Sequence, residues 1–187
     1  ETLRRADPVA TRPGNAFGPA PTHNGTGAAF ENGSTPLDPR MTFANFVRGS
    51  SNILAVSAAE RMAAVEQPLF SPLYFQAATG QGKTHLMHAI GHAYRAQNPG
   101  ARVLYMSAER FMVDFVQSMR GKAMMEFKTR LRDADMLLID DIQFIVGKAS
   151  TQEEFLHTID ALSSTGKRLI VAADRAPQAL DGVDQRI

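Results

Sequence analysis

A glycine-rich segment, flanked by an apolar stretch and a helical pattern, places the strongest constraint on the fold of this chain. Residues 69–75 are short and apolar, which predicts a buried strand, and residues 83–96 carry apolar side chains on one helical face. The segment that joins them holds Thr79, Gly80, Gln81, Gly82, Lys83 and Thr84. Its glycines let the main chain approach an anion, and the amides at the start of the next helix point toward it. The segment therefore predicts a strand, loop and helix unit that binds phosphate.

The residues that follow the glycines indicate a nucleotide rather than a simple anion. The expected cofactor is ATP or ADP with Mg²⁺. Lys83 is expected to bridge the β- and γ-phosphates of ATP, and the Thr84 hydroxyl to ligate Mg²⁺. The strict motif has a glycine five residues before Gly82, where this chain has Ala77. An alanine disfavours a positive φ at the strand exit. The alternative is a glycine-rich turn that only caps an ordinary helix.

A pair of carboxylates follows a second apolar run. Residues 136–139 predict a buried strand, and Asp140 and Asp141 come directly after it, at the end where ligands of parallel sheets gather. Downstream of a phosphate loop this is a Walker B pair, in which Asp140 holds Mg²⁺ and Asp141 orients the attacking water. An aspartate at the second position reaches one methylene less far than glutamate, so hydrolysis is expected to be slow. The alternative is that both acids simply face solvent.

Another acid, Asp174, follows the last predicted strand, residues 169–172. It stands where related ATPases place a polar residue that senses the γ-phosphate, so it is the candidate sensor. A turn-capping role before Pro177 is the competing interpretation.

Strands and helices alternate along the chain, and this alternation predicts the architecture. A further apolar strand is expected at 103–106, and helices at 52–64, around 111–119, around 125–131 and after Thr151. Thr151 and Glu154 have the spacing of a capping box at the start of the last helix, which Gly166 closes. Because fully apolar strands belong in a parallel sheet covered on both faces, the prediction is a three-layer α/β P-loop NTPase core of the AAA+ type, residues 37–187.

Composition separates this core from what precedes it. Residues 1–36 are rich in Gly, Pro, Ser, Thr and Asn, which predicts a disordered, flexible linker. The chain has no cysteine and no apolar run of the roughly 18 residues that a membrane span needs, so we expect a cytoplasmic protein without disulfides. A net charge of +1 does not by itself indicate nucleic-acid binding.

Several motifs together resemble one family. They include Phe43 to Val47 with Gly49 to Asn52, Gly80 to Gly91, Leu137 to Phe144, Thr151 to Phe155 with His157 and Thr158, and Asp174 with Arg175. This series resembles the ATPase domain of the bacterial chromosomal replication initiators of the DnaA family, almost continuously from residue 37 to 187. The resemblance implies an ATP-dependent initiator of DNA replication that binds Mg-ATP, assembles with copies of itself at the origin and promotes strand opening.

The resemblance also implies roles for individual residues. The segment that contains Val47 and Asn52 packs near the adenine in that family, and residues matching Val116 and Lys148 contact single-stranded DNA. A basic residue common two positions after the lysine is Ser150 here, which removes one phosphate contact. From the residues alone, Val116 is a core side chain, and the basic cluster at 120–132 is a solvated helical face.

Other implied partners involve the intact protein. The chain begins at Glu1 without methionine and stops at Ile187, before the family's arginine finger, lid and helix-turn-helix, so we expect a fragment of a longer protein. The missing C-terminal part would bind duplex origin DNA, and the replicative helicase and acidic phospholipid are further partners of the family. Two alternatives stay open, a helicase-loader-type AAA+ ATPase and a nucleotide-locked regulatory interaction module.

Overall fold

The computed structural model describes residues 34–64 and 70–180. These residues form a four-stranded sheet, in which every neighbouring pair of strands is parallel, in the order β1-β4-β3-β2. The strands are β1 (Leu73–Gln76), β2 (Val103–Ser107), β3 (Met136–Asp140) and β4 (Arg168–Ala173). The predicted α/β class and parallel sheet are confirmed.

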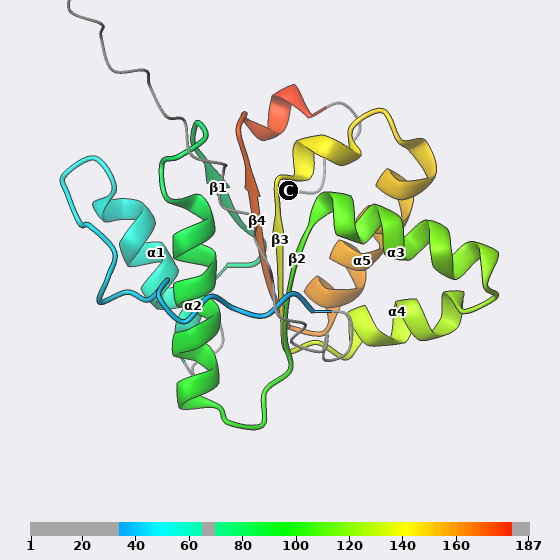
Figure 1. Cartoon of the computed structure of the whole chain (residues 1–187), viewed down its shortest axis with the longest axis horizontal. Coiled ribbons are helices and arrows are strands. Elements are labelled where there is room, and N and C mark those ends of the chain that lie inside the picture. Colours follow the sequence, from blue (N-terminus) through cyan, green and yellow to red (C-terminus); the bar gives the residue numbers. More distant parts are fainter. Residues whose placement is uncertain (1–33, 65–69, 181–187) are drawn as a thin grey trace, which may run out of the picture.

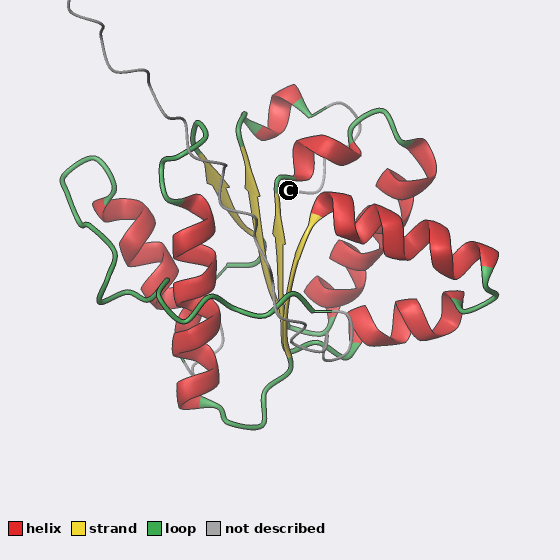
Figure 2. Cartoon of the chain, viewed as in Figure 1, coloured by secondary structure: helices red, strands yellow, loops and turns green. Residues whose placement is uncertain are grey.

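Helices cover both faces of this sheet, so the molecule has three layers (Figures 1 and 2). One face carries α1 (Ile53–Ala63) and α2 (Lys83–Gln97), and the other carries α3 (Ala108–Arg120), α4 (Met124–Arg132) and α5 (Ala149–Ser164). Two short 3₁₀ turns, η2 (Ile142–Ile145) and η3 (Pro177–Ala179), follow β3 and β4. No helix in the described ranges is long and apolar enough to cross a membrane.

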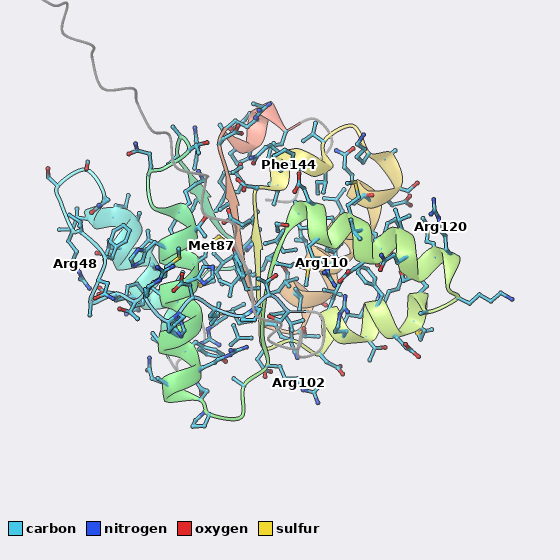
Figure 3. The ribbon with its side chains drawn as sticks, viewed as in Figure 1. Arg48, Met87, Arg102, Arg110, Arg120 and Phe144 are labelled. Atoms are coloured by element: carbon cyan, nitrogen blue, oxygen red, sulfur yellow. The ribbon has the colours of Figure 1, made fainter. Side chains whose placement is uncertain are left out.

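Two apolar clusters explain why the central strands have continuous apolar sequences. Every residue of β3 and β4 is buried, because their side chains point alternately into the cluster under α1 and α2 and the cluster under α3, α4 and α5. Met87 of α2 is fully buried and is labelled in Figure 3. The strand predicted at 69–75 begins later, at Leu73, and residue 69 lies outside the described part.

The predicted capping box at the start of α5 is wrong. The helix begins at Ala149, so Thr151 lies inside its first turn and is buried. Glu154 is also buried, and its carboxylate pairs with Lys128 Nζ of α4 at 2.9 Å. Glu154, which the local pattern assigned to the start of the helix, forms an ion pair with another helix instead.

A second ion-pair group joins the two helices of the α3–α4 pair. Asp114 is buried and accepts from Arg110 Nε at 2.7 Å and from Arg130 Nη2 at 2.9 Å. Arg130 and Lys128 are therefore engaged within the protein, whereas Arg120, at the end of α3, extends into solvent (Figure 3). The basic cluster is thus only partly a solvated face.

The N-terminal segment of the described chain lies along the exposed edge of β2. Thr35 N donates to the Tyr105 carbonyl at 2.8 Å, and Tyr105 N donates to Ser34 Oγ at 3.1 Å. Leu37 packs on Gly91, where an added Cβ would lie 2.7 Å from Leu37 Cδ1. The expected linker, residues 1–36, lies outside the described residues except for its last three positions.

Candidate functional site

The glycine-rich loop joins β1 to α2 at the carboxyl end of the sheet. Gly80 and Gly82 have φ of 81° and 86°, conformations that L side chains rarely adopt. Ala77 is not among the described non-glycine residues with positive φ, and its N–H donates to Ala173 O at 3.3 Å, which extends the β1–β4 pairing. The alanine therefore fits the loop, because the left-handed positions fall on the two glycines.

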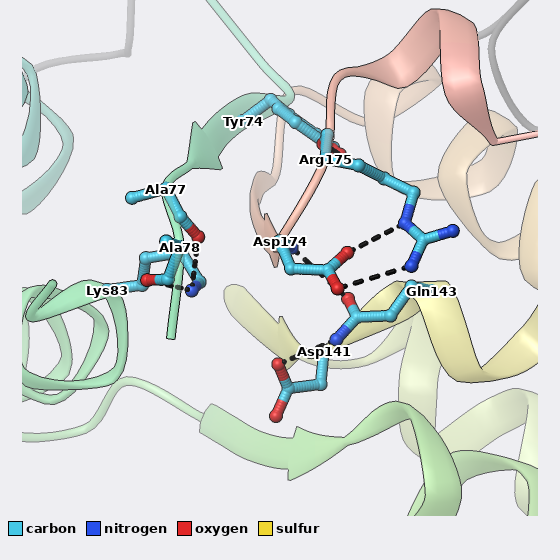
Figure 4. Close-up of polar contacts among 8 residues, drawn as sticks. All are labelled: Tyr74, Ala77, Ala78, Lys83, Asp141, Gln143, Asp174 and Arg175. Carbon is cyan, nitrogen blue, oxygen red and sulfur yellow. Dashed lines mark hydrogen bonds and ion pairs between the residues drawn. The ribbon is translucent and has the colours of Figure 1, made fainter. Parts of the chain in front are cut away.

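Lys83, the first residue of α2, turns its side chain back over this loop. It is only 8% exposed, and Nζ donates to Ala77 O at 2.6 Å and Ala78 O at 3.2 Å (Figure 4). The ammonium group is thus held above the same loop whose amides precede the helix. Thr79 and Gln81 lie on the exposed part of the loop.

Thr84 and Asp140 meet across the sheet end. The Thr84 hydroxyl donates to Asp140 Oδ2 at 2.5 Å, and Asp141 N donates to Asp140 Oδ1 at 2.9 Å. Asp140 is 3% exposed, and burial raises the pKa of its carboxyl, partly offset by the Thr84 hydrogen bond. The two residues predicted to hold Mg²⁺ are therefore in direct contact.

The oxygen donors at this point fit Mg²⁺. That ion is held by one or two carboxylates together with hydroxyl, phosphate and water oxygens, not by a cage of many protein ligands. The described residues contain no group of three or more histidine, cysteine or acidic side chains arranged for a metal. Thr84 and Asp140 together offer the small set of oxygens that the ion requires.

The second carboxylate belongs to a network at the ends of β3 and β4. Asp141 has a φ of 57°, and its Oδ1 accepts from Gln143 Nε2 at 3.0 Å. The Gln143 Oε1 accepts in turn from the Asp174 main-chain N at 3.4 Å, and the Asp174 carboxylate pairs with Arg175 at 2.8 Å (Figure 4). This ion pair lowers the pKa of Asp174. Gln143 thus links the predicted water-orienting acid to the predicted sensor.

The segment expected near the base lies beside the phosphate loop. Phe46 packs on Gly82, where an added Cβ would lie 2.8 Å from Phe46 Cε2. Val47 is 84% exposed, and Asn52 closes the segment by donating to Val47 O and accepting from Gly49 N. Val47 thus directly follows the residue that contacts the loop, and Asn52 is joined to Val47 by a hydrogen bond.

The two residues that the resemblance assigns to DNA are placed elsewhere. Val116 is half-buried and packs against the apolar cluster under α3. Lys148 is exposed and is the N-cap residue of α5. No hydrogen bond or ion pair within 34–64 and 70–180 joins either residue to the phosphate loop.

Sequence reasoning missed two side chains of the site. Tyr105 donates to Asp140 Oδ2 at 3.4 Å, and burial, together with the Asp140 carboxylate, raises the pKa of its phenol. Gln143 is the other. The signal for Tyr105 was a polar tip inside an apolar strand, two residues before Ser107, the residue that pairs with Asp140 on the neighbouring strand.

Comparison with known proteins agrees with this geometry. The family model of the bacterial DnaA ATPase domain matches residues 37–187. The chain belongs to the DnaA family. The chromosomal replication initiator protein DnaA of Sphingopyxis alaskensis is 56% identical over 170 residues, which cover 90% of this chain and 38% of that protein.

Solved DnaA structures share the fold. Domain III of DnaA from Thermotoga maritima matches with a TM-score of 0.77 at 39% identity, over 81% of this chain and 65% of that one. A DnaA structure with AMPPCP and single-stranded DNA matches with a TM-score of 0.75 at 38% identity, over 80% of this chain and 46% of that one. The chain spans about a third of the length of the curated DnaA relatives it matches.

Proposed function

We propose that this chain is the ATP-binding domain of a chromosomal replication initiator. In this proposal it binds Mg-ATP, and the bound nucleotide controls assembly with further copies at the origin and the opening of the strands. The observation that carries the proposal is the convergence of Lys83, Thr84 and Asp140 at the carboxyl end of a parallel sheet. The identity of the relatives as chromosomal replication initiators, and the AMPPCP and single-stranded DNA of one DnaA structure, support the same function.

Each residue of the site has a role that follows from its chemistry. The main chain of residues 79–82 donates to phosphate oxygens, and Lys83 neutralises the β- and γ-phosphates. Thr84 and Asp140 would hold Mg²⁺, and the ion would supply positive charge to balance the charge that develops on the phosphates during transfer. Val47 and Asn52 border the adenine.

Hydrolysis, in this proposal, depends on Asp141. Gln143 holds one of its carboxylate oxygens, which leaves the other to accept a hydrogen bond from the attacking water. Asp174 reports the γ-phosphate through the same glutamine. Because the aspartate is short and partly engaged, we infer slow turnover, as suits a switch.

The remaining partners belong to the intact protein. Val116 and Lys148 contact single-stranded DNA within this domain, and duplex origin DNA is bound by a C-terminal domain. Self-assembly in the ATP state, the replicative helicase and acidic phospholipid complete the proposed set. Membership of the DnaA family favours this function over that of a helicase loader.

Calorimetric titration of the intact protein with Mg-ATP tests the nucleotide site. Lys83→Ala should abolish the heat of binding, because it removes the cation that faces the phosphates. Lys167→Ala is the matched control, since this lysine precedes β4 at the opposite end of the sheet and forms only a 3.6 Å pair with Asp135. Equal ATP affinity in the two variants would overturn the assignment.

The hold of Gln143 on Asp141 also favours one alternative, a module that binds nucleotide and does not hydrolyse it. Single-turnover hydrolysis by the intact protein separates the two. Under the switch, Asp141→Ala should slow hydrolysis at least tenfold. Equal and measurable rates for wild type and variant would remove Asp141 from the mechanism, whereas a wild-type rate no higher than that of ATP without protein would support the locked module.

A further inference from the structure

Three histidines form a row along α2 and hold the segment that leads to the nucleotide site. His85 Nε2 lies 2.8 Å from Thr42 O, His88 Nδ1 accepts from Asp38 N at 2.9 Å, and His92 Nε2 lies 2.8 Å from Asp38 O. Their spacing of three and four residues places them on one face of the helix. We call them the histidine row.

The partners of the histidine row are all main-chain groups. Because a carbonyl oxygen only accepts, Nε2 of His85 and Nε2 of His92 each carry the proton and donate it. Because Asp38 N only donates, Nδ1 of His88 is unprotonated. Residues 38–42 have no regular secondary structure, so these bonds satisfy polar groups that a helix or strand would otherwise pair.

The row ends at the phosphate loop. His85 directly follows Thr84, and its ring meets the Phe46 ring at 5.2 Å with an interplanar angle of 76°. Phe46 in turn packs on Gly82, the left-handed glycine before Lys83. A single contact path therefore runs from the helix start through His85 and Phe46 to Val47.

We propose that His85 and Phe46 are positioning residues that fix the base-binding segment, residues 47–52, relative to the phosphate loop. This inference rests on the proposed nucleotide site. Neither residue is proposed to contact phosphate. His85 anchors residues 42–46 by its hydrogen bond to Thr42 and its ring contact, and Phe46 sets the distance between that segment and Gly82.

The phosphate and base contacts of ATP can be tested separately with two ligands. ATP reaches both the phosphate loop and the base-binding segment, whereas inorganic tripolyphosphate reaches only the loop. Loss of His85 should release residues 42–46, so the base contacts weaken while the phosphate contacts remain. The ratio of ATP affinity to tripolyphosphate affinity therefore reports positioning, and a general loss of stability does not change it.

The experiment measures that ratio by calorimetry in the intact protein with Mg²⁺. His85→Ala and Phe46→Ala should each lower ATP affinity about tenfold and leave tripolyphosphate affinity within about twofold, given a lost hydrogen bond and a lost ring contact. The double variant should be no weaker than about tenfold, since both changes interrupt one path. His85→Gln should recover part of the loss, because its amide can donate to Thr42 O.

Two controls make the outcome decisive. His92→Ala removes the other end of the histidine row, so it should lower the melting temperature and leave the affinity ratio at the wild-type value. Lys83→Ala should lose both ligands. Equal losses of ATP and tripolyphosphate in His85→Ala, or an unchanged ratio with only a lower melting temperature, would overturn the inference. A wild type that binds neither ligand would instead refute the proposed function.

Discussion

The buried histidine of the row, His88, should make the stability of this chain depend on pH. Its ring is 5% exposed and lies against Tyr105 at 4.2 Å between ring centroids. Burial, followed by the charge of His92, lowers the pKa of His88 to about 4, from an ordinary value of 6.5. The neutral ring is also the form that accepts from Asp38 N. Folding therefore opposes protonation of this residue.

The sign and size of the effect follow from proton linkage. Above pH 6.5 the ring is neutral in both the folded and the unfolded chain, so its contribution to stability is complete. As pH falls toward 4, only the unfolded chain gains the proton, and the stability is lost. A pH of 5 lies about 1.5 units below the pKa of the ring in the unfolded chain. At about 1.4 kcal/mol per unit, protonation of the unfolded chain therefore lowers the free energy of unfolding by about 2 kcal/mol.

Urea denaturation at pH 8 and pH 5 measures this loss. In His88→Asn the side-chain oxygen can still accept from Asp38 N but does not titrate, so this variant should lose about 2 kcal/mol less than wild type between the two pH values. His157→Asn is the matched control, because His157 is 54% exposed on α5 and should leave the wild-type difference in place. Equal pH dependence in wild type and His88→Asn would refute the reasoning.

Three further predictions concern other parts of the molecule. Asp114→Ala should lower the free energy of unfolding by about 2 kcal/mol, since it leaves two arginines without their buried carboxylate; thermal denaturation against Arg120→Ala as control checks this. Gly82→Ala should reduce Mg-ATP affinity at least tenfold by calorimetry, more than Gly80→Ala, because both positions have positive φ but only Gly82 contacts Phe46. Lys148→Ala in the intact ATP-bound protein should weaken single-stranded DNA binding and lower the slope of log affinity against log salt by about 1, and an unchanged slope would contradict the DNA assignment.

The layered fold was predictable from the sequence because the central strands are buried on both faces. The strand Met136 to Asp140 is buried on both faces, so its first four side chains are all apolar. That apolar run is visible in the sequence and predicts a buried strand. The phosphate loop was predictable for a related reason, since its glycines, lysine and threonine act through adjacent main-chain geometry. The sequence predicted these features because the residues that form each of them are adjacent in the chain.

The capping box shows where that agreement ends. Thr151 and Glu154 satisfy the local pattern, yet Glu154 pairs with Lys128 on another helix, and the N-cap of α5 is Lys148 rather than Thr151. A true side-chain cap exists instead at Ser107, whose Oγ accepts from Arg110 N at 3.2 Å. Sequence spacing alone did not distinguish the two serine and threonine positions, because the deciding partner lies in a different element.

The same reason explains the site residues that were missed. Tyr105 acts through Asp140 on the neighbouring strand, and Gln143 joins Asp141 to Asp174, which follows a different strand. The histidine row acts on a segment 43 to 54 residues earlier in the chain. These contacts depend on the order of strands and on the path of residues 38–46, which no local pattern specifies. The residues expected to touch nucleotide could thus be named from the sequence, and those that position them could not.

The backbone conformation of Asp141 gives a physical reason why this position holds an aspartate. Its φ of 57° and ψ of 46° put it in the left-handed region, where aspartate is tolerated better than most residues because a short polar side chain can bond locally. Here that local partner is Gln143, two residues on. The Gln143 side chain of η2 therefore holds the Asp141 carboxylate beside this turn. A longer side chain would have to form that bond from the same left-handed backbone, which tolerates aspartate well.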